Sequence, residues 1–379
     1  MRRISDSIAR LAATRPAMPL LPGTGADRLD DVPAFGSNPG QLRARQYVPG
    51  NLRPGAPLVV VLHGCTQSAS GYDDGSGWST LADRHGFALL YPEQQRSNNA
   101  NLCFNWFVPA DIERGSGEAL SIRQMVEKML DDHALDPARV FVTGLSAGGA
   151  MTSVMLATYP DVFAGGAIIA GLPYGSAVTL PAALERMRGI GAPGAARLGA
   201  LVREASPHRG PWPTISVWHG TGDQVVAISN LGSIIDQWCA VHGLERDAFH
   251  AESVDGHDRR VWRGADGRAC IEAIIITAMG HGTPIAPRGA DGCGIGAPYF
   301  LDVGVSSSAR IAAFWGIDGE TAAYELVEPP RTSSIAASQL VLETVPPAAS
   351  AGSARPEARG GINLADVIND ALRAAGLLR

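Results

Sequence analysis

The sequence has little that would anchor the chain in a membrane or on nucleic acid. It contains no continuous apolar stretch of about 18 residues, the shortest that spans a membrane as a helix, so a transmembrane helix is excluded. Residues 1–23 lack the continuous apolar segment of a secretory signal. Basic residues are not in excess, because 31 Lys and Arg stand against 37 Asp and Glu, a net charge of −6. We therefore expect no nucleic acid partner.

Cysteine is also scarce, with five residues whose spacings match no zinc pattern: Cys65, Cys103, Cys239, Cys270 and Cys293. We therefore expect no metal centre. An odd number leaves at least one thiol unpaired within the chain. The missing signal favours the cytoplasm, whereas disulfides would favour export, and the residues alone leave these alternatives open.

Short apolar runs alternate with segments of helical periodicity. Buried strands are predicted over 57–64, 87–92, 138–146, 165–173 and 213–220, preceded by an alternating strand over 42–49. Helices are predicted over 77–86, 116–134 and 148–160. This alternation predicts an α/β fold with a mostly parallel central sheet and helices on both faces. The carboxyl ends of the strands then meet at one edge, where active sites of such sheets gather.

Composition divides the chain into four segments. Residues 1–34 are predicted to be an N-terminal extension with a short amphipathic helix, and residues 35–317 the folded domain. Residues 174–212 form a Gly-, Ala- and Pro-rich, partly helical insertion that could cap the strand edge. An Ala/Pro/Ser-rich linker is predicted over 318–361. An amphipathic helix over 362–379 would dock on the domain or on a partner.

Residues 144–148 read GLSAG, which fits the G-x-S-x-G pattern of a nucleophile elbow. The pattern alone is weak in a chain with 45 glycines, but here it follows a buried strand and opens a helix. Gly144 and Gly148 would let the backbone turn sharply, because a Cβ at either position would crowd it. Ser146 is therefore the candidate nucleophile, and the alternative is a serine in an ordinary tight turn.

A serine nucleophile needs a general base and an acid that orients it. Asp223 follows the strand 213–220, and His281 follows the apolar stretch IEAIIITAMG. Their order after Ser146 is the Ser–Asp–His order of this elbow type. Asp223 could instead form a turn. His219 competes for the role of base, but it precedes Asp223, and we therefore favour His281.

An oxyanion hole needs two backbone amides directed at one point. One is expected from Ala147, the residue after the nucleophile. The second is expected in HGCTQ (63–67), after an earlier strand, from Cys65 or Thr66. We favour Cys65.

Six blocks resemble the esterase family of polyhydroxybutyrate depolymerases, whose relatives include feruloyl and acetylxylan esterases. They are LHGCTQ (62–67), CFNWF (103–107), GLSAGGAM (144–151), HGTGDQVV (219–226), GHGTP (280–284) and YFLDVG (299–304). The resemblance covers about 35–317 and implies an α/β-hydrolase fold without metal or organic cofactor.

By this resemblance, Ser146, Asp223 and His281 are the catalytic residues, and the amides of Cys65 and Ala147 form the oxyanion hole. Trp106 would pack against the acyl chain, the alternative being an ordinary core aromatic. Asn105 would orient its loop or touch the substrate.

Two disulfides are hypotheses within this resemblance. A Cys65–Cys103 bridge would tie the oxyanion loop to the Trp106 loop, and a Cys239–Cys270 bridge would join the helix after Asp223 to the strand before His281. The family resemblance and these cysteines favour an extracellular or periplasmic location.

The sequence therefore predicts a serine carboxylic ester hydrolase that acts through an acyl-enzyme on hydroxyalkanoate polyesters or oligomers. One alternative is a feruloyl or acetylxylan-type esterase. Another is a non-catalytic protein that binds granules or a partner, although such a protein would have no need of all three catalytic residues. A serine peptidase on the same fold is a third, with no propeller-like domain to support it.

Overall fold

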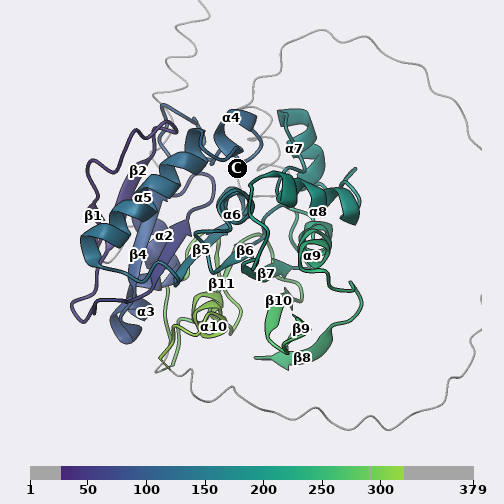
Figure 1. The fold of residues 1–379 in the computed structure, drawn as a ribbon. Helices are drawn as coiled ribbons and strands as arrows, with labels where there is room; N and C mark the ends of the chain where they lie inside the picture. Colours follow the sequence, from purple (N-terminus) through teal and green to yellow (C-terminus); the bar gives the residue numbers. More distant parts are fainter. Residues whose placement is uncertain (1–26, 290–291, 320–379) are drawn as a thin grey trace, which may run out of the picture. The chain divides into compact units, whose positions relative to one another are not determined.

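The structure, a computed structural model, describes residues 27–289 and 292–319 (Figure 1). The predicted helix within 1–34, the predicted linker from residue 320 onward and the predicted C-terminal helix over 362–379 lie outside these residues.

A large sheet forms the centre of the described domain, with strand order β1-β2-β4-β3-β5-β6-β7-β10-β9-β8. The strands are β1 (Asp30–Asp31), β2 (Arg43–Tyr47), β3 (Leu58–Leu62), β4 (Ala88–Glu93), β5 (Val140–Leu145), β6 (Gly165–Ile169), β7 (Thr214–Gly220), β8 (His250–Val254), β9 (His257–Arg263) and β10 (Ala269–Ile276). A separate parallel pair joins β11 (Thr283–Ile285) to β12 (Phe300–Asp302).

The middle six strands, from β4 to β10 in that order, are parallel to one another. Every residue of β3, β5 and β6 is buried, which explains why these strands appear in the sequence as unbroken apolar runs. At the two sides, β2 and β9 pair antiparallel with their inner neighbours. The sheet is therefore mostly parallel, as predicted, but mixed.

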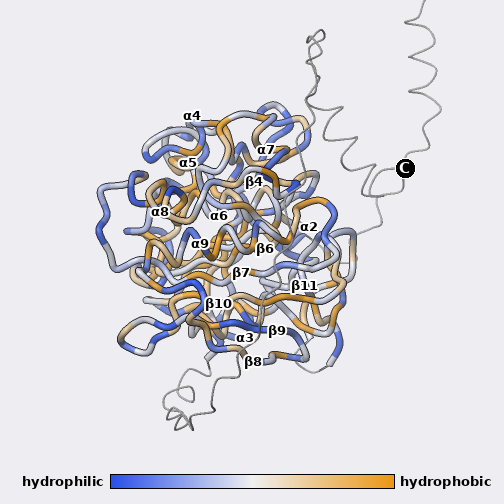
Figure 2. The backbone as a smooth tube through the Cα atoms, turned by 90° about the vertical axis from the view of Figure 1, so that its right-hand side faces the viewer, coloured by the Kyte–Doolittle hydropathy of each residue, from blue (hydrophilic) through white to orange (hydrophobic). Residues whose placement is uncertain are grey.

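Helices cover both faces of the sheet (Figure 1), and apolar segments run through the middle of the domain (Figure 2). The helices are α2 (Ala69–Ser76), α3 (Trp78–His85), α4 (Pro109–Ile112), α5 (Gly117–His133), α6 (Ala147–Thr158), α7 (Leu180–Met187), α8 (Ala195–Glu204), α9 (Ser229–His242) and α10 (Ser307–Phe314). One core contains apolar side chains of α5, α6 and α9, and a second contains those of α2, α3 and α10.

The insertion over 174–212 contains α7 and α8, and only its first part reaches the strand edge where a cap was predicted. Ala177 and Ala183 pack with Trp106 and Ala147 in a third, smaller apolar cluster. Helix α8 instead packs on α9, on one face of the sheet. The insertion is thus part cap and part ordinary covering layer.

The β8–β9 hairpin was not predicted from the sequence. Its outer strand β8 is almost fully exposed, and the inner strand β9 buries chiefly Val261 and Trp262.

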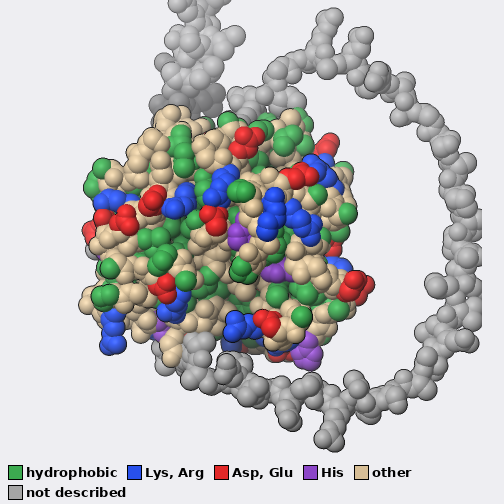
Figure 3. Space-filling view, in the orientation of Figure 1, with side chains coloured by type: hydrophobic (Ala, Val, Ile, Leu, Met, Phe, Trp, Pro, Cys, Tyr) green, Lys and Arg blue, Asp and Glu red, His purple; other side chains and the backbone are tan. Residues whose placement is uncertain are grey.

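On the face of the molecule shown in Figure 3, basic and acidic side chains are interspersed with apolar ones. None of the helices within 27–289 and 292–319 is long and apolar enough to cross a membrane.

Candidate active site

Ser146 lies at the turn between β5 and α6, with φ 57° and ψ −116°. This backbone conformation is strained for a residue with a side chain, and such strain persists where the surrounding structure holds it. The surroundings here do so, because the Ser146 amide donates to the carbonyl of Ile169 (2.9 Å) and its carbonyl accepts from the amide of Ala150 (2.8 Å). The half-buried serine is therefore presented on a sharp turn at the start of a helix.

Glycine is required on both sides of this turn. A Cβ added to Gly144 would lie 2.5 Å from the carbonyl of Gly148. A Cβ added to Gly148 would lie 2.2 Å from the carbonyl oxygen of Leu62 and 2.5 Å from that of His63. The turn that carries Ser146 thus lies directly against the end of β3, where the predicted oxyanion loop begins.

Asp223 and His281 are brought together by two further strand ends. Asp223 follows β7 and His281 follows β10, and both strands run parallel to β5, so all three predicted residues lie at one edge of the sheet. His281 Nδ1 donates to Asp223 Oδ2 at 2.7 Å. The other carboxylate oxygen, Oδ1, accepts from the amides of Val225 (2.8 Å) and Val226 (2.9 Å). Asp223 is thereby fixed on both oxygens and directs the second ring nitrogen of His281 away from itself.

His219, the alternative base, approaches the same carboxylate oxygen of Asp223 as His281. Its side chain is fully buried, its Nε2 donates to the carbonyl of Val226 (2.8 Å) and the same atom lies 3.5 Å from Asp223 Oδ2. A ring nitrogen committed in this way is unavailable as a general base. Burial would raise the pKa of Asp223, but hydrogen bonds from His219 and His281 hold that pKa below its usual range, so the carboxylate stays charged.

The backbone of the HGCTQ loop leaves one amide without a partner. The amides of Gly64, Thr66 and Gln67 donate to Gln67 Oε1 (2.7 Å), the Asn101 carbonyl (2.7 Å) and the Gly64 carbonyl (3.3 Å). Among the described residues, neither the amide of Cys65 nor that of Ala147 donates a hydrogen bond. These two amides, rather than Thr66, therefore remain the predicted oxyanion donors.

Trp106 packs in an apolar cluster beside the nucleophile. The cluster, which we call the acyl cluster, consists of Cys103, Trp106, Ala147, Ala150, Leu172, Ala177, Ala183 and Val226. The Trp106 ring meets Phe107 edge to face, with centroids 5.2 Å apart. Trp106 is only 7% exposed, so its packing is that of a core aromatic, and its contact with an acyl chain stays a prediction from the resemblance.

Asn105 is committed to its loop. Its side chain donates to Asp111 Oδ2 (3.1 Å) and accepts from Asn99 Nδ2 (3.0 Å), while its amide donates to Glu118 Oε2 (2.8 Å). Of the two predicted roles, these contacts favour loop orientation over substrate contact.

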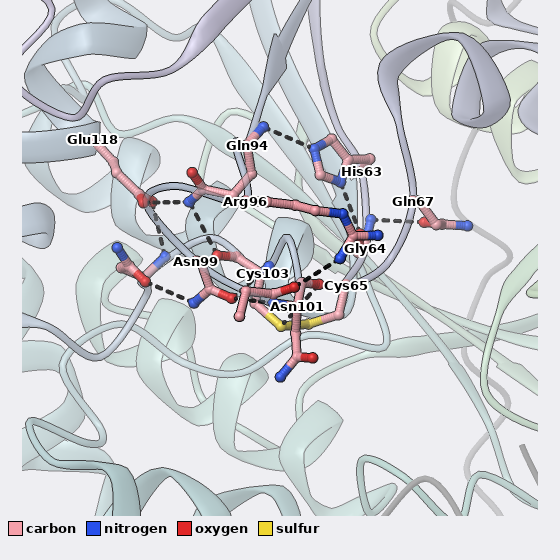
Figure 4. Close-up of a disulfide and its surroundings, with 12 residues drawn as sticks. His63, Gly64, Cys65, Gln67, Gln94, Arg96, Asn99, Asn101, Cys103 and Glu118 are labelled. Carbon is pink, nitrogen blue, oxygen red and sulfur yellow. Dashed lines mark hydrogen bonds between the residues drawn. A yellow bond between two sulfur atoms is a disulfide. The ribbon is translucent and has the colours of Figure 1, made fainter. Parts of the chain in front are cut away.

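Cys65 and Cys103 form a disulfide that ties the two loops together, as Figure 4 shows. The Cys239–Cys270 pairing was wrong, because both are free thiols. Cys239 points into the core from α9, whereas the Cys270 thiol turns toward the β9–β10 turn and donates to the Arg268 carbonyl (3.8 Å). Cys293 is also free and buried.

His63 is a residue of the site that the sequence analysis treated only as the neighbour of a glycine. It is 1 % exposed, its Nδ1 donates to the Gly64 carbonyl (2.8 Å) and its Nε2 accepts from the Gln94 amide (3.1 Å). Burial lowers the pKa of His63 to about 4, so the ring is neutral and holds the loop as a fixed tautomer. The signal available in the sequence was a histidine directly after a fully buried strand.

The comparisons with known proteins concern the family and the fold. The family model "Esterase PHB depolymerase" matches residues 43–261. The chain is 49% identical over 297 residues to a poly(3-hydroxyalkanoate) depolymerase C of Paucimonas lemoignei, covering 77% of this chain and 70% of that one. It is 34% identical over 274 residues to feruloyl esterase B of Talaromyces stipitatus, covering 70% and 75%.

An acetyl xylan esterase from Aspergillus awamori shares the fold, with a TM-score of 0.65 at 24% identity over 77% of this chain and all of that chain. The fold is thus that of the α/β hydrolases, and the protein is a carboxylic ester hydrolase. Within that class the chain belongs to the esterase family of PHB depolymerases. Among the described residues, no three His, Cys, Asp or Glu side chains are placed to hold a metal ion.

We expect the denatured, unreduced protein to show three free thiols, and five after reduction, because one bridge uses two of the five cysteines. Titration with Ellman's reagent before and after reduction measures both numbers. Five free thiols before reduction would exclude the Cys65–Cys103 bridge. A single free thiol before reduction would indicate a second disulfide.

Lowering the pH should destabilise the folded protein, because His63 is neutral when folded and takes up a proton on unfolding. The unfolded histidine binds a proton near pH 6.5 and the native one only near pH 4, so stability is lost as the pH falls between these values. The difference corresponds to about 3 kcal/mol at most. We expect urea unfolding to show a larger loss from pH 7 to pH 4.5 in the wild type than in His63→Gln. The exposed His250→Gln serves as control, and equal losses in all three proteins would contradict the assignment.

Proposed function

We propose that the protein cleaves the ester bonds of short-chain hydroxyalkanoate polyesters or their oligomers through an acyl-enzyme on Ser146. The observation that carries this mechanism is the 2.7 Å bond between His281 Nδ1 and Asp223 Oδ2, formed at the sheet edge where the Ser146 turn also lies. The Paucimonas lemoignei relative supports the polyester substrate. The acyl cluster beside the serine supports an apolar acyl group.

In the first half of the reaction, Ser146 Oγ attacks the ester carbonyl while His281 accepts its proton. The negative charge on the carbonyl oxygen is stabilised by the amides of Cys65 and Ala147, at the positive end of the α6 dipole. Asp223 stabilises the imidazolium that forms. His281 then gives the proton to the leaving alkoxide, which departs as an alcohol.

In the second half, a water molecule gives a proton to His281 and attacks the acyl-enzyme. The same amides hold the second tetrahedral oxyanion. Collapse breaks the bond to Ser146, returns the proton to Oγ and releases a carboxylic acid. Every proton thus passes through one imidazole, which is why its orientation by Asp223 matters.

Exposed apolar side chains lie at both ends of α7. Val178 is 58% exposed and Ile190 56%, while Ala177 and Ala183 of the same segment pack in the acyl cluster. Exposed apolar side chains on the segment that also packs against the acyl cluster suit a polymer chain better than a small, polar sugar ester.

A feruloyl or acetylxylan-type activity is the second candidate. It is favoured by the relatives bearing these names, which are 34% identical to this chain over most of its length. The catalytic residues would be the same, and only the group held against Trp106 would differ.

Replacing the nucleophile tests the mechanism. We expect Ser146→Ala to lower kcat by at least about 10⁴-fold, since removal of a triad serine has effects of this size. The substrates are p-nitrophenyl butyrate, hydroxybutyrate oligomers, emulsified polyester and methyl ferulate. Ser306→Ala, which removes the N-cap of α10, should keep wild-type activity. Unchanged ester cleavage in Ser146→Ala would refute the mechanism, and a preference for ferulate would favour the second candidate.

The surface around α7 should matter only for the polymer. We expect the double substitution Val178→Ser and Ile190→Ser to slow hydrolysis of emulsified polyester by about 30-fold or more, because each apolar side chain buried on the polymer contributes about 1–2 kcal/mol to adsorption. Hydrolysis of soluble hydroxybutyrate oligomers should stay unchanged. Ile295→Ser is the matched control. Ile295 is similarly exposed but lies beside α2, where its amide donates to the carbonyl of Gly75, and not in the α7 segment. An equal loss on both substrates, or in the control, would contradict this role.

A further inference from the structure

We propose that Gln94, itself held by Glu118, is a positioning residue that fixes the amide of Cys65 in the oxyanion hole. This inference rests on the proposed function. Neither residue touches the nucleophile, and both act through the loop 63–67 and its disulfide.

Gln94 directly follows β4 and is 2% exposed. Its side-chain Nε2 donates to Glu118 Oε1 (2.6 Å) and to the carbonyl of Cys103 (3.0 Å). Its Oε1 accepts from the amide of Gln95 (2.9 Å) and from Asn98 Nδ2 (2.8 Å). Both donor hydrogens and both acceptor positions of this amide are therefore used, and its orientation is fixed.

Two routes lead from Gln94 to Cys65, and Figure 4 shows both. On the first, the Gln94 amide donates to His63 Nε2, and His63 Nδ1 donates to the Gly64 carbonyl. That carbonyl belongs to the peptide unit whose N–H is the Cys65 amide. The proposed oxyanion donor is thus oriented from the carbonyl side of its own peptide.

The second route runs through the disulfide. Gln94 Nε2 holds the carbonyl of Cys103, and the Cys103 sulfur is bonded to that of Cys65. The neighbouring Thr66 amide is held at the same time by the Asn101 carbonyl (2.7 Å). The Cys65 peptide is therefore held both through its backbone and through its side chain, and Gln94 is the residue that the two routes share.

Glu118 lies at the start of α5 and is fully buried. Three N–H donors surround its carboxyl group: Gln94 Nε2 (2.6 Å), the Asn105 amide (2.8 Å) and Asn98 Nδ2 (3.3 Å). Burial raises the pKa of Glu118 to about 8. Both oxygens accept hydrogen bonds, Oε1 from Gln94 and Asn98 and Oε2 from the Asn105 amide. A buried carboxyl group with this set of partners serves to hold donors in place.

The consequence for catalysis follows from geometry. Hydrogen bonds weaken steeply when donor and acceptor are misaligned, and the oxyanion exists only in the tetrahedral states. A loosened Cys65 amide should therefore weaken binding of those states and leave substrate binding nearly unchanged. A residue that serves stability alone would not produce this separation.

We test the proposal with Gln94→Met, which keeps the approximate volume of the side chain and removes all four side-chain hydrogen bonds. The main-chain donation to His63 Nε2 remains in this variant, so the loss measures the side-chain route through the Cys103 carbonyl. We expect kcat on p-nitrophenyl butyrate to fall about 10- to 100-fold, less than or comparable to complete loss of one oxyanion donor. KM should change less than about threefold. The inhibition constant of a short-chain trifluoromethyl ketone, whose adduct with Ser146 carries an oxyanion, should rise by a similar factor to the fall in kcat.

The matched control is Gln124→Met on α5. Gln124 likewise joins two loop groups, accepting from the Asn38 amide (3.0 Å) and donating to Ser37 Oγ (3.0 Å), but it has no path to residue 65. It should keep kcat and the inhibition constant, with all assays run well below each melting temperature.

If Gln94→Met does not fold, Glu118→Gln takes its place. This change replaces one of the two acceptor oxygens by an NH2 group that faces at least one of the three donors. The same paired change in kcat and ketone inhibition is expected. Wild-type kcat and inhibition in the folded variant would overturn the proposal, as would an equal loss in Gln124→Met. Inactive wild type, or full activity in Ser146→Ala, would instead overturn the proposed function.

Discussion

The site depends on how closely the start of α6 lies against the end of β3. Only a glycine at position 148 permits this approach, because a Cβ there would lie 2.2 Å from the carbonyl oxygen of Leu62. The contact sets the turn of Ser146 beside the loop that begins at His63. It requires two neighbouring parallel strands, β3 and β5, to end at the same level, which their paired register from Leu58 to Leu62 provides. The remaining parts of the site are arranged around this contact.

Two hydrogen-bond networks, one around a charged carboxylate and one around backbone amides, hold the residues that meet at this contact. The acid and base come from the ends of β7 and β10, where Asp223 is bonded on both oxygens and stays charged. The oxyanion loop is supported from the other direction, by β4 and α5, through Gln94 and Glu118. The first support fixes a charge and the second fixes neutral amides. Both place dipoles before the reaction begins, so little reorganisation is needed as charge develops on the substrate.

Much of this arrangement could be predicted from the sequence, because buried parallel strands are continuous apolar runs and polar residues directly after them stand out. Asp223 and His281 were found in this way, and the structure bonds them to each other. The β8–β9 hairpin was missed because its outer strand is exposed and its sequence, HAESV, has no apolar run. The Cys239–Cys270 pairing failed because chain positions near each other in the fold do not fix the direction of a side chain.

The network behind the oxyanion loop could not be predicted for a more general reason. Glu118 and Gln94 are polar residues at the start of a helix and just after a strand, where polar residues usually face water. No neighbouring residue in the sequence indicates that they are buried, because their partners are distant along the chain. Gln94 and Glu118 are 24 residues apart, and His63 lies 31 residues before Gln94. Burying such groups is costly unless every donor and acceptor is paired. Their near-complete pairing in this structure is therefore the observation that indicates a specific task, and the loop to which they are bonded indicates what that task is.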